Sequence, residues 1–104
     1  MKTQKAIEYD VRTIDEYGDV ADLDSFYSDG AHSKRRAIES AQQIVRNGGT
    51  AVVERVTYTM DKDKDEFDAR KVVDVEYEKI WTGGDHDRLI AGGWRTEDSE
   101  GGAA

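Results

Sequence analysis

The sequence predicts an α+β fold in the order β-β-α-β-β, an antiparallel four-stranded sheet with one helix packed on one face. Residues 31–47 have apolar side chains at helical spacing, and two pairs of segments with strand-like composition flank them. A chain of 104 residues is close to the usual size of one domain. We therefore expect a single domain over residues 1–96, followed by a flexible tail over residues 97–104.

The first two strands are predicted over residues 6–14 and 20–27. In the first, an apolar set should face the core: Ile7, Tyr9 and Val11. The alternating charged set should face solvent: Glu8, Asp10 and Arg12. Between the strands, Gly18 should supply the positive φ that a hairpin turn needs. The second strand alternates less clearly, and we place Leu23 and Tyr27 on its inward face.

The helix is predicted over residues 31–47 by one apolar stripe: Ala37, Ile38, Ala41, Ile44 and Val45. The Asn-Gly-Gly that follows should end it, because Asn and Gly tolerate the left-handed conformation of a C-cap. For the N-cap we prefer Ser28 or Asp29 to Ser33. The earlier start moves the cations at residues 34–36 away from the positive end of the helix dipole.

The second pair of strands is predicted over residues 50–60 and 70–81, joined by an acidic loop over residues 61–68. In the last strand one face should be apolar: Val73, Val75, Tyr77 and Trp81. The other face is acidic: Asp74, Glu76 and Glu78. We expect these acids to share the open face of the sheet with the charged set of the first strand. Further on, Leu89 and Trp94 should form a small cluster over one edge of the sheet.

The net charge of −8 makes direct binding to nucleic acid or to an anionic membrane unfavourable, since both present phosphates. The chain has no cysteine, which excludes disulfides and thiolate metal sites. The N-terminal residues contain no apolar stretch typical of a signal peptide, and no apolar run is long enough to span a membrane. A cytoplasmic protein is the expectation.

Motifs for catalysis or metal binding are incomplete. Three aspartates match the first ligand positions of an EF-hand calcium loop: Asp61, Asp63 and Asp65. The match then fails, because Glu66 replaces the required glycine and Val72 replaces the final glutamate. Asp85-His86-Asp87 has no second histidine at a fixed spacing. We expect no enzyme activity, metal or cofactor; a metal-dependent hydrolase is an alternative that these acids leave open.

The acids of the loop and of the last strand suggest instead a surface that binds a protein with a basic, nucleic-acid-binding surface. The candidate partner-binding residues are Asp61, Asp63, Asp65, Glu66, Asp74, Glu76, Glu78 and Trp81. Trp81 is included because an exposed tryptophan ringed by acids is typical of an interface hot spot; a core or lid position for Trp81 is the alternative. We expect the cations at residues 34–36 to pair with Glu39 or with the sheet acids. Self-association into a homodimer through a sheet edge, which no proline guards, is an alternative.

The layout resembles that of small acidic, cysteine-free proteins of phages and other mobile elements, the anti-CRISPR proteins among them. The similar parts are the hairpin over residues 7–27, the helix with its Ala37-Ile38 and Ala41, and the strands over residues 50–60 and 70–81. The resemblance implies a protein that inhibits a nucleic-acid-binding complex by steric block or by imitating nucleic-acid charge. It assigns no role to a particular residue.

Overall fold

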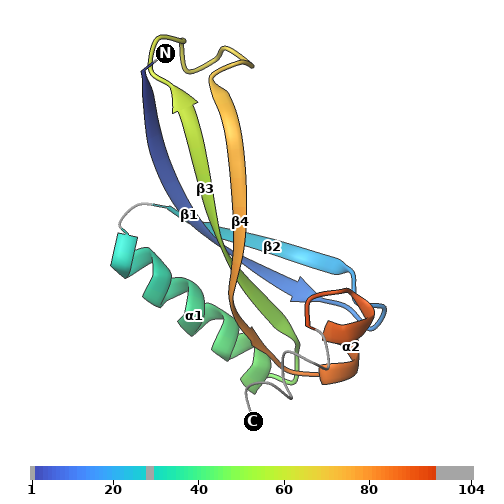
Figure 1. Ribbon diagram of the computed structural model, residues 1–104. Coiled ribbons are helices and arrows are strands. Elements are labelled where there is room, and N and C mark those ends of the chain that lie inside the picture. The colour runs from blue at the N-terminus through green and yellow to red at the C-terminus, as the bar shows by residue number, and fades with distance from the viewer. Residues whose placement is uncertain (1, 28–29, 96–104) are drawn as a thin grey trace.

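The computed structural model describes residues 2–27 and 30–95. Its elements in chain order are β1 (Thr3–Ile14), β2 (Val20–Phe26), α1 (Gly30–Arg46), β3 (Ala51–Asp61), β4 (Val72–Gly83) and α2 (His86–Ala91). The strands form one antiparallel sheet in the order β2-β1-β3-β4, with α1 on one face (Figure 1). This confirms the predicted α+β fold, to which α2 is an addition. The predicted tail from Glu97 onward lies outside the described residues.

The main core lies between α1 and the sheet. Ala37 and Ala41 are fully buried and belong to one cluster with Tyr9, Val11 and Val53. Larger side chains pack around this cluster: Phe26, Ile44, Ile80 and Trp81. The apolar stripe predicted from helical spacing therefore does face the sheet.

The C-terminal end of α1 agrees with the predicted stop signal. Gly48 has φ of +89°, and its N–H donates to the carbonyl of Val45 at 3.0 Å, while Gly49 donates to Ile44 at 2.9 Å. This pair of bonds is the Schellman motif, which satisfies carbonyls that the helix leaves unpaired. At the other end α1 begins at Gly30, ahead of Ser33. The preferred N-cap residues, Ser28 and Asp29, lie outside the described residues.

A second, smaller core lies on the other face of the sheet. Ile14, Val52 and Leu89 are buried there, with Trp94 packed against them. The Trp94 indole N–H donates to the carbonyl of Gly18 at 3.0 Å. The predicted apolar cluster of Leu89 and Trp94 thus exists, but it covers a face of the sheet and not an edge. Part of the reverse face is consequently closed by α2.

β4 departs from simple alternation at two irregularities, each with one extra residue: Val73 and Ile80. Because of the extra residue before it, Trp81 pairs with Val53 and faces α1. Val75 and Tyr77 pair with residues of the opposite face. The prediction that Val73, Val75, Tyr77 and Trp81 share one face is therefore wrong.

The acids of β4 lie on the same side of the sheet as α1. Glu76 pairs with Thr57, which in turn pairs with Ile7, a residue of the predicted core row of β1. Glu8 and Asp10 alternate with that row and so face the other way. The predicted single acidic face is wrong, because the register of β4 aligns its acids with the apolar row of β1.

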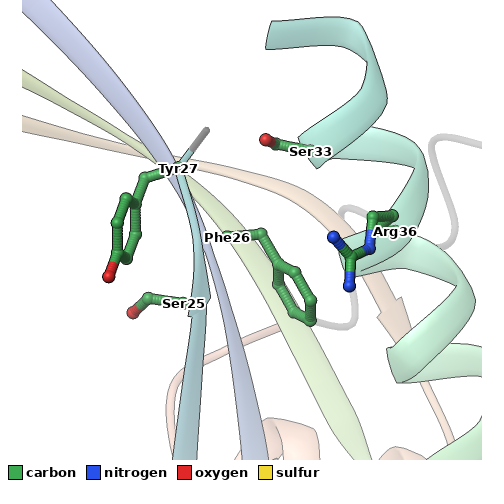
Figure 2. A pocket seen from close by; sticks show the side chains of 5 residues that line it. All are labelled: Ser25, Phe26, Tyr27, Ser33 and Arg36. Carbon is green, nitrogen blue, oxygen red and sulfur yellow. The ribbon is translucent and has the colours of Figure 1, made fainter. Parts of the chain in front are cut away.

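The inward and outward faces of β2 are the reverse of those predicted. Phe26 pairs with Tyr9 and points toward α1, where the Arg36 guanidinium lies 5.6 Å from its ring centre (Figure 2). Tyr27 points to the other side of the strand in the same view. Leu23 and Tyr27 are both exposed, so their inward placement is wrong. Phe26 takes the inward position instead, where it packs against the main core.

The sheet extends well beyond α1 and β2 (Figure 1). β2 pairs with β1 only from Tyr9 onward, whereas β3 pairs with β1 from Thr3. The projecting part consists of residues 3–8, 56–61 and 72–77 with the loop 62–71, and we call it the arm. It makes the molecule elongated, with extents of 45 × 25 × 25 Å.

Candidate protein-interaction surface

The arm carries most of the acids predicted to bind a partner. The exposed acids on the arm are Asp63, Asp65, Glu66, Asp74 and Glu76, and Glu78 is exposed directly below it on β4. The three acids of β4 form one row, since alternate residues of a strand lie about 7 Å apart on the same face. The row remains exposed because the arm projects beyond the helix that covers this face lower down.

Asp61 does not belong to this surface. Its side chain is buried, with 7% of the residue exposed, and its Oδ1 accepts the backbone N–H of Asp63 at 2.9 Å. The Asp61 carbonyl also accepts the N–H of Lys64 at 3.3 Å. Asp61 therefore shapes the start of the loop, and its assignment as a partner-binding residue is wrong.

Asp68 shapes the other end of the loop. Its Oδ1 accepts the backbone N–H of Arg70 at 2.9 Å, and its Oδ2 lies 3.1 Å from the guanidinium of the same residue. The side-chain bond to Arg70, followed by the backbone bond, lowers the pKa of the Asp68 carboxyl. Asp61 and Asp68 together hold the loop at its two ends.

Phe67 is the residue that sequence analysis missed. It is 92% exposed and, with Asp65, Glu66 and Asp68, lines a shallow hollow at the tip of the arm. Aromatic residues such as Phe67 are enriched at protein interfaces, which makes it a candidate anchor for a partner. The signal in the sequence is the isolated phenylalanine in an otherwise charged loop, which strand periodicity does not detect.

Trp81 lies in the core and not on the arm. It packs against the cluster that contains Ala37 and Val53, and it crosses over Gly83, where an added Cβ would lie 2.5 Å from its ring. Of the two alternatives for Trp81, a core residue and an interface residue, the structure shows the core residue, so its inclusion among the partner-binding residues is wrong. Tyr77, 60% exposed, and Phe67 are the exposed aromatic residues of β4 and the loop.

A charged cluster lies on the sheet face away from α1. Asp10 is only 4% exposed; it accepts the hydroxyl of Ser25 at 2.8 Å and lies 3.6 Å from the Arg12 guanidinium. Arg12 also donates to the Glu54 carboxylate at 2.5 Å. The cluster is closely hydrogen-bonded, which is the condition for burying charge at low cost.

Two pKa values in this region are strongly raised. Burial raises the pKa of Glu8 to about 7, and a hydrogen bond and repulsion from Asp10 add to the effect. Burial, followed by the negative charge of Glu8, raises the pKa of Tyr58 to about 12. Glu8 thus gains and loses a proton near neutral pH, beside an aspartate that is fixed by its neighbours.

The other candidate residues, namely the possible metal ligands and the basic residues 34–36, have structural roles or local partners. Within residues 2–27 and 30–95 no group of three His, Cys, Asp or Glu side chains is placed to hold a metal ion. Asp85 is the N-cap of α2 and accepts the N–H of Arg88 at 3.1 Å. Among the basic residues 34–36, Arg35 donates to His32 at 2.9 Å and Arg36 covers Phe26, in place of the predicted pairing with Glu39 or the sheet acids.

Within the described part of the chain, neither helix has the length and apolarity needed to cross a membrane. The arm thus stands as the candidate surface on geometry alone, with its acidic row, its held loop and its exposed Phe67. Comparisons with protein families, with curated proteins and with solved structures give no match to this chain.

Proposed function

We propose that this chain is a non-enzymatic, cytoplasmic protein-binding module whose arm docks in a basic, nucleic-acid-binding groove of a partner protein. The observation that carries this proposal is the row of exposed carboxylates on β4, beside a loop in which exposed acids alternate with lysines around Phe67. A row of negative charges along a strand matches the Lys and Arg side chains that line such a groove.

The proposed action is inhibition. An arm seated in the groove occupies the space of the nucleic acid and satisfies the cations that would hold its phosphates. Phe67 would supply the apolar anchor, because charge alone gives fast association but limited affinity. This is the mode of action that the resemblance to anti-CRISPR proteins implies.

The test compares two variants with the same change of charge. The arm variant combines Asp63→Lys, Asp65→Lys and Glu66→Lys, all in the exposed loop. The control variant combines Glu16→Lys, Asp22→Lys and Asp24→Lys, which are exposed at the far end of the sheet. Each is used to capture proteins from the native host, and captured proteins are identified by mass spectrometry.

We expect wild type and the control variant to capture the same nucleic-acid-binding protein and the arm variant to lose it. Affinity for that protein should fall steeply between about 50 mM and about 500 mM NaCl, because salt screens exposed charges. Added wild type should also displace nucleic acid from it. Equal capture by both variants, or an affinity that salt does not change, would contradict the proposal.

A further inference from the structure

The outer edge of β4 has no neighbouring strand. β4 is the last strand of the order β2-β1-β3-β4, and its residues 72–77 run along the arm beyond α1 (Figure 1). Alternate residues of an edge strand direct their N–H and C=O groups away from the sheet. Such groups are a template on which another strand can pair.

The side chains along this edge form two different rows. The row on the α1 side consists of Asp74, Glu76 and Glu78. The row on the other side contains Val75 and Tyr77, of which Tyr77 is largely exposed. A strand that pairs here therefore meets carboxylates on one face and apolar surface on the other.

A second copy of this chain does not fit the edge. Two β4 strands paired antiparallel about a two-fold axis must place side chains of the same face opposite one another. In the registers centred within residues 74–78, Asp74, Glu76 and Glu78 would then oppose themselves or each other, and like charges directly opposite destabilise a strand pair. The predicted homodimer through a sheet edge is thus disfavoured at β4, and β3 is an interior strand with no free edge.

On the side of β4 that pairs with β3, one of its acids already binds an arginine. Arg55 of β3 lies opposite Glu78 and forms an ion pair with it. The hydrogen bond that Arg55 donates to Glu78, followed by one that it donates to Tyr9, raises the pKa of Arg55. Asp74 and Glu76 face Thr59 and Thr57 instead, and within the described residues no ion pair reaches either acid. Their charges remain available to a cation on the outer side.

We propose that the edge of β4 binds an extended segment of the partner as an added strand, with Lys or Arg at every second position. The basic residues would lie opposite Asp74 and Glu76, and the intervening apolar residues would lie beside Val75 and Tyr77. This inference rests on the proposed function and specifies how the basic partner is held. Backbone hydrogen bonds give the strand its affinity, and the alternation of cations gives its specificity.

The test uses a short peptide that alternates Lys and Val, with a peptide of the same composition that has its Lys and Val in separate blocks. Hydrogen exchange of the backbone amides is followed by NMR in the isotope-labelled full chain. The alternating peptide should slow exchange of the outward amides within residues 72–78. The block peptide has equal charge but cannot present one cationic face as a strand, so it should leave these amides unprotected.

Charge variants distinguish binding at the β4 edge from a general effect of the protein's negative charge. Asp74→Lys with Glu76→Lys should weaken binding of the alternating peptide by about tenfold, since two cross-strand attractions become repulsions. Asp22→Lys with Asp24→Lys makes the same charge change on β2 and should weaken it less than about threefold. Circular dichroism checks folding, and Asp74→Asn with Glu76→Gln repeats the test without introducing cations.

Slowed exchange in β4, together with loss of binding in the β4 variants only, supports the inference. Equal binding of both peptides without slowed exchange overturns it. The proposed function would survive that result, because docking by charge needs no strand pairing. Failure of both peptides to bind also overturns the inference, and the capture experiment then decides the proposed function separately.

Discussion

Glu8 shows how a single side chain can respond to pH near neutrality. It lies on the sheet face away from α1, next to Asp10, whose own carboxylate is held by Ser25 and Arg12. Burial is the main reason that the pKa of Glu8 is raised to about 7, and Asp10 adds to it; the hydrogen bonds from Tyr58 and Ser25 act in the opposite direction. A protonated Glu8 is thus favoured in the folded state at a pH where it would be ionised in the unfolded chain.

The first prediction concerns the pH dependence of stability. Between pH 4.5 and about 7 the folded protein binds more protons at Glu8 than the unfolded chain, so this contribution to stability is lost as pH rises through that window. Glu8→Gln removes the titration. The variant should gain about 1–2 kcal/mol over wild type at about pH 8, after allowance for solvent screening, and little at about pH 4. Urea unfolding at several pH values measures this; a difference independent of pH would contradict it.

The second prediction compares two glycines with similar backbones. Gly18 and Gly48 have φ of +87° and +89°, so alanine is strained at both. A Cβ on Gly48 would meet nothing within 4 Å, whereas one on Gly18 would lie 2.4 Å from the backbone nitrogen of Gly92. Gly48→Ala should therefore cost about 1 kcal/mol, from strain alone.

Gly18→Ala should cost clearly more, about 2–4 kcal/mol, because backbone atoms have to move. Thermal unfolding of both variants under one condition gives the comparison. Equal losses would show that the approach of Gly18 to Gly92 contributes nothing to stability.

At the scale of elements, α2 is the clearest case of structure that the sequence did not predict. It has only six residues, too few for helical spacing to be recognised, and Gly83-Gly84 before it indicated the end of regular structure. Tertiary contacts form it, since Leu89 is fully buried against Ile14 and Val52. The apolar cluster was predictable from composition, but its location over a sheet face was not.

The third prediction tests whether α2 is part of the stable fold. Leu89→Ala should destabilise the protein by about 2–4 kcal/mol, as is usual when a fully buried leucine is truncated. Ile90→Ala in the same helix is the matched control, because Ile90 is only partly buried, and it should cost less. Chemical unfolding followed by tryptophan fluorescence suits this test, since Trp94 packs on the same cluster. Similar losses for both variants would mean that α2 is not docked as described.

Strands were predicted to within a few residues, yet the faces of two of them were not. The extra Ile80 turns Trp81 toward α1, and a bulge has no signature in the alternation of side chains. In β2 both alternating sets contain apolar residues, so the packing of Phe26 against α1 decided the orientation. In β1 charged and apolar residues alternate strictly, and Tyr9 and Val11 face the core as predicted. The expectation for the other residues is wrong in part, because Asp10 is buried and Ile7 is 45% exposed.

Sequence patterns also predicted only part of the candidate site. Most of the predicted partner-binding acids lie on the arm and are exposed, because composition alone identifies a solvated acidic segment. Asp61 and Trp81 were wrong, since a buried turn acceptor and a core tryptophan depend on contacts distant in sequence. Phe67 was missed because no periodic pattern includes a loop residue.

For the molecule as a whole, acidic side chains line both edge strands of the sheet, β2 and β4. On β2, Asp22 and Asp24 pair with Thr13 and Val11 and so lie on the α1 side, as the acids of β4 do. A symmetric antiparallel pairing of either edge with its own copy brings carboxylates together.

The fourth prediction is that removing this charge permits self-association. A variant with Asp22→Asn, Asp24→Asn, Asp74→Asn and Glu76→Gln should form dimers or larger species where wild type stays monomeric, because its edges no longer repel one another. Light scattering over a range of concentrations measures this. A variant with four other exposed acids neutralised, namely Glu16, Asp63, Asp65 and Glu66, should remain monomeric. Association of both variants would point to net charge instead of edge repulsion.

The N-terminal residues run to the far end of the arm, where the Lys2 carbonyl accepts the N–H of Lys62 at 2.9 Å. Lys2 therefore lies beside the start of the loop that carries Phe67, so a group attached near it is close to the arm. A bulky affinity tag placed there would shield the arm and could hide the very partner that a capture experiment seeks. A small fluorophore at the same point would instead sit where docking changes its surroundings, and so would report binding directly.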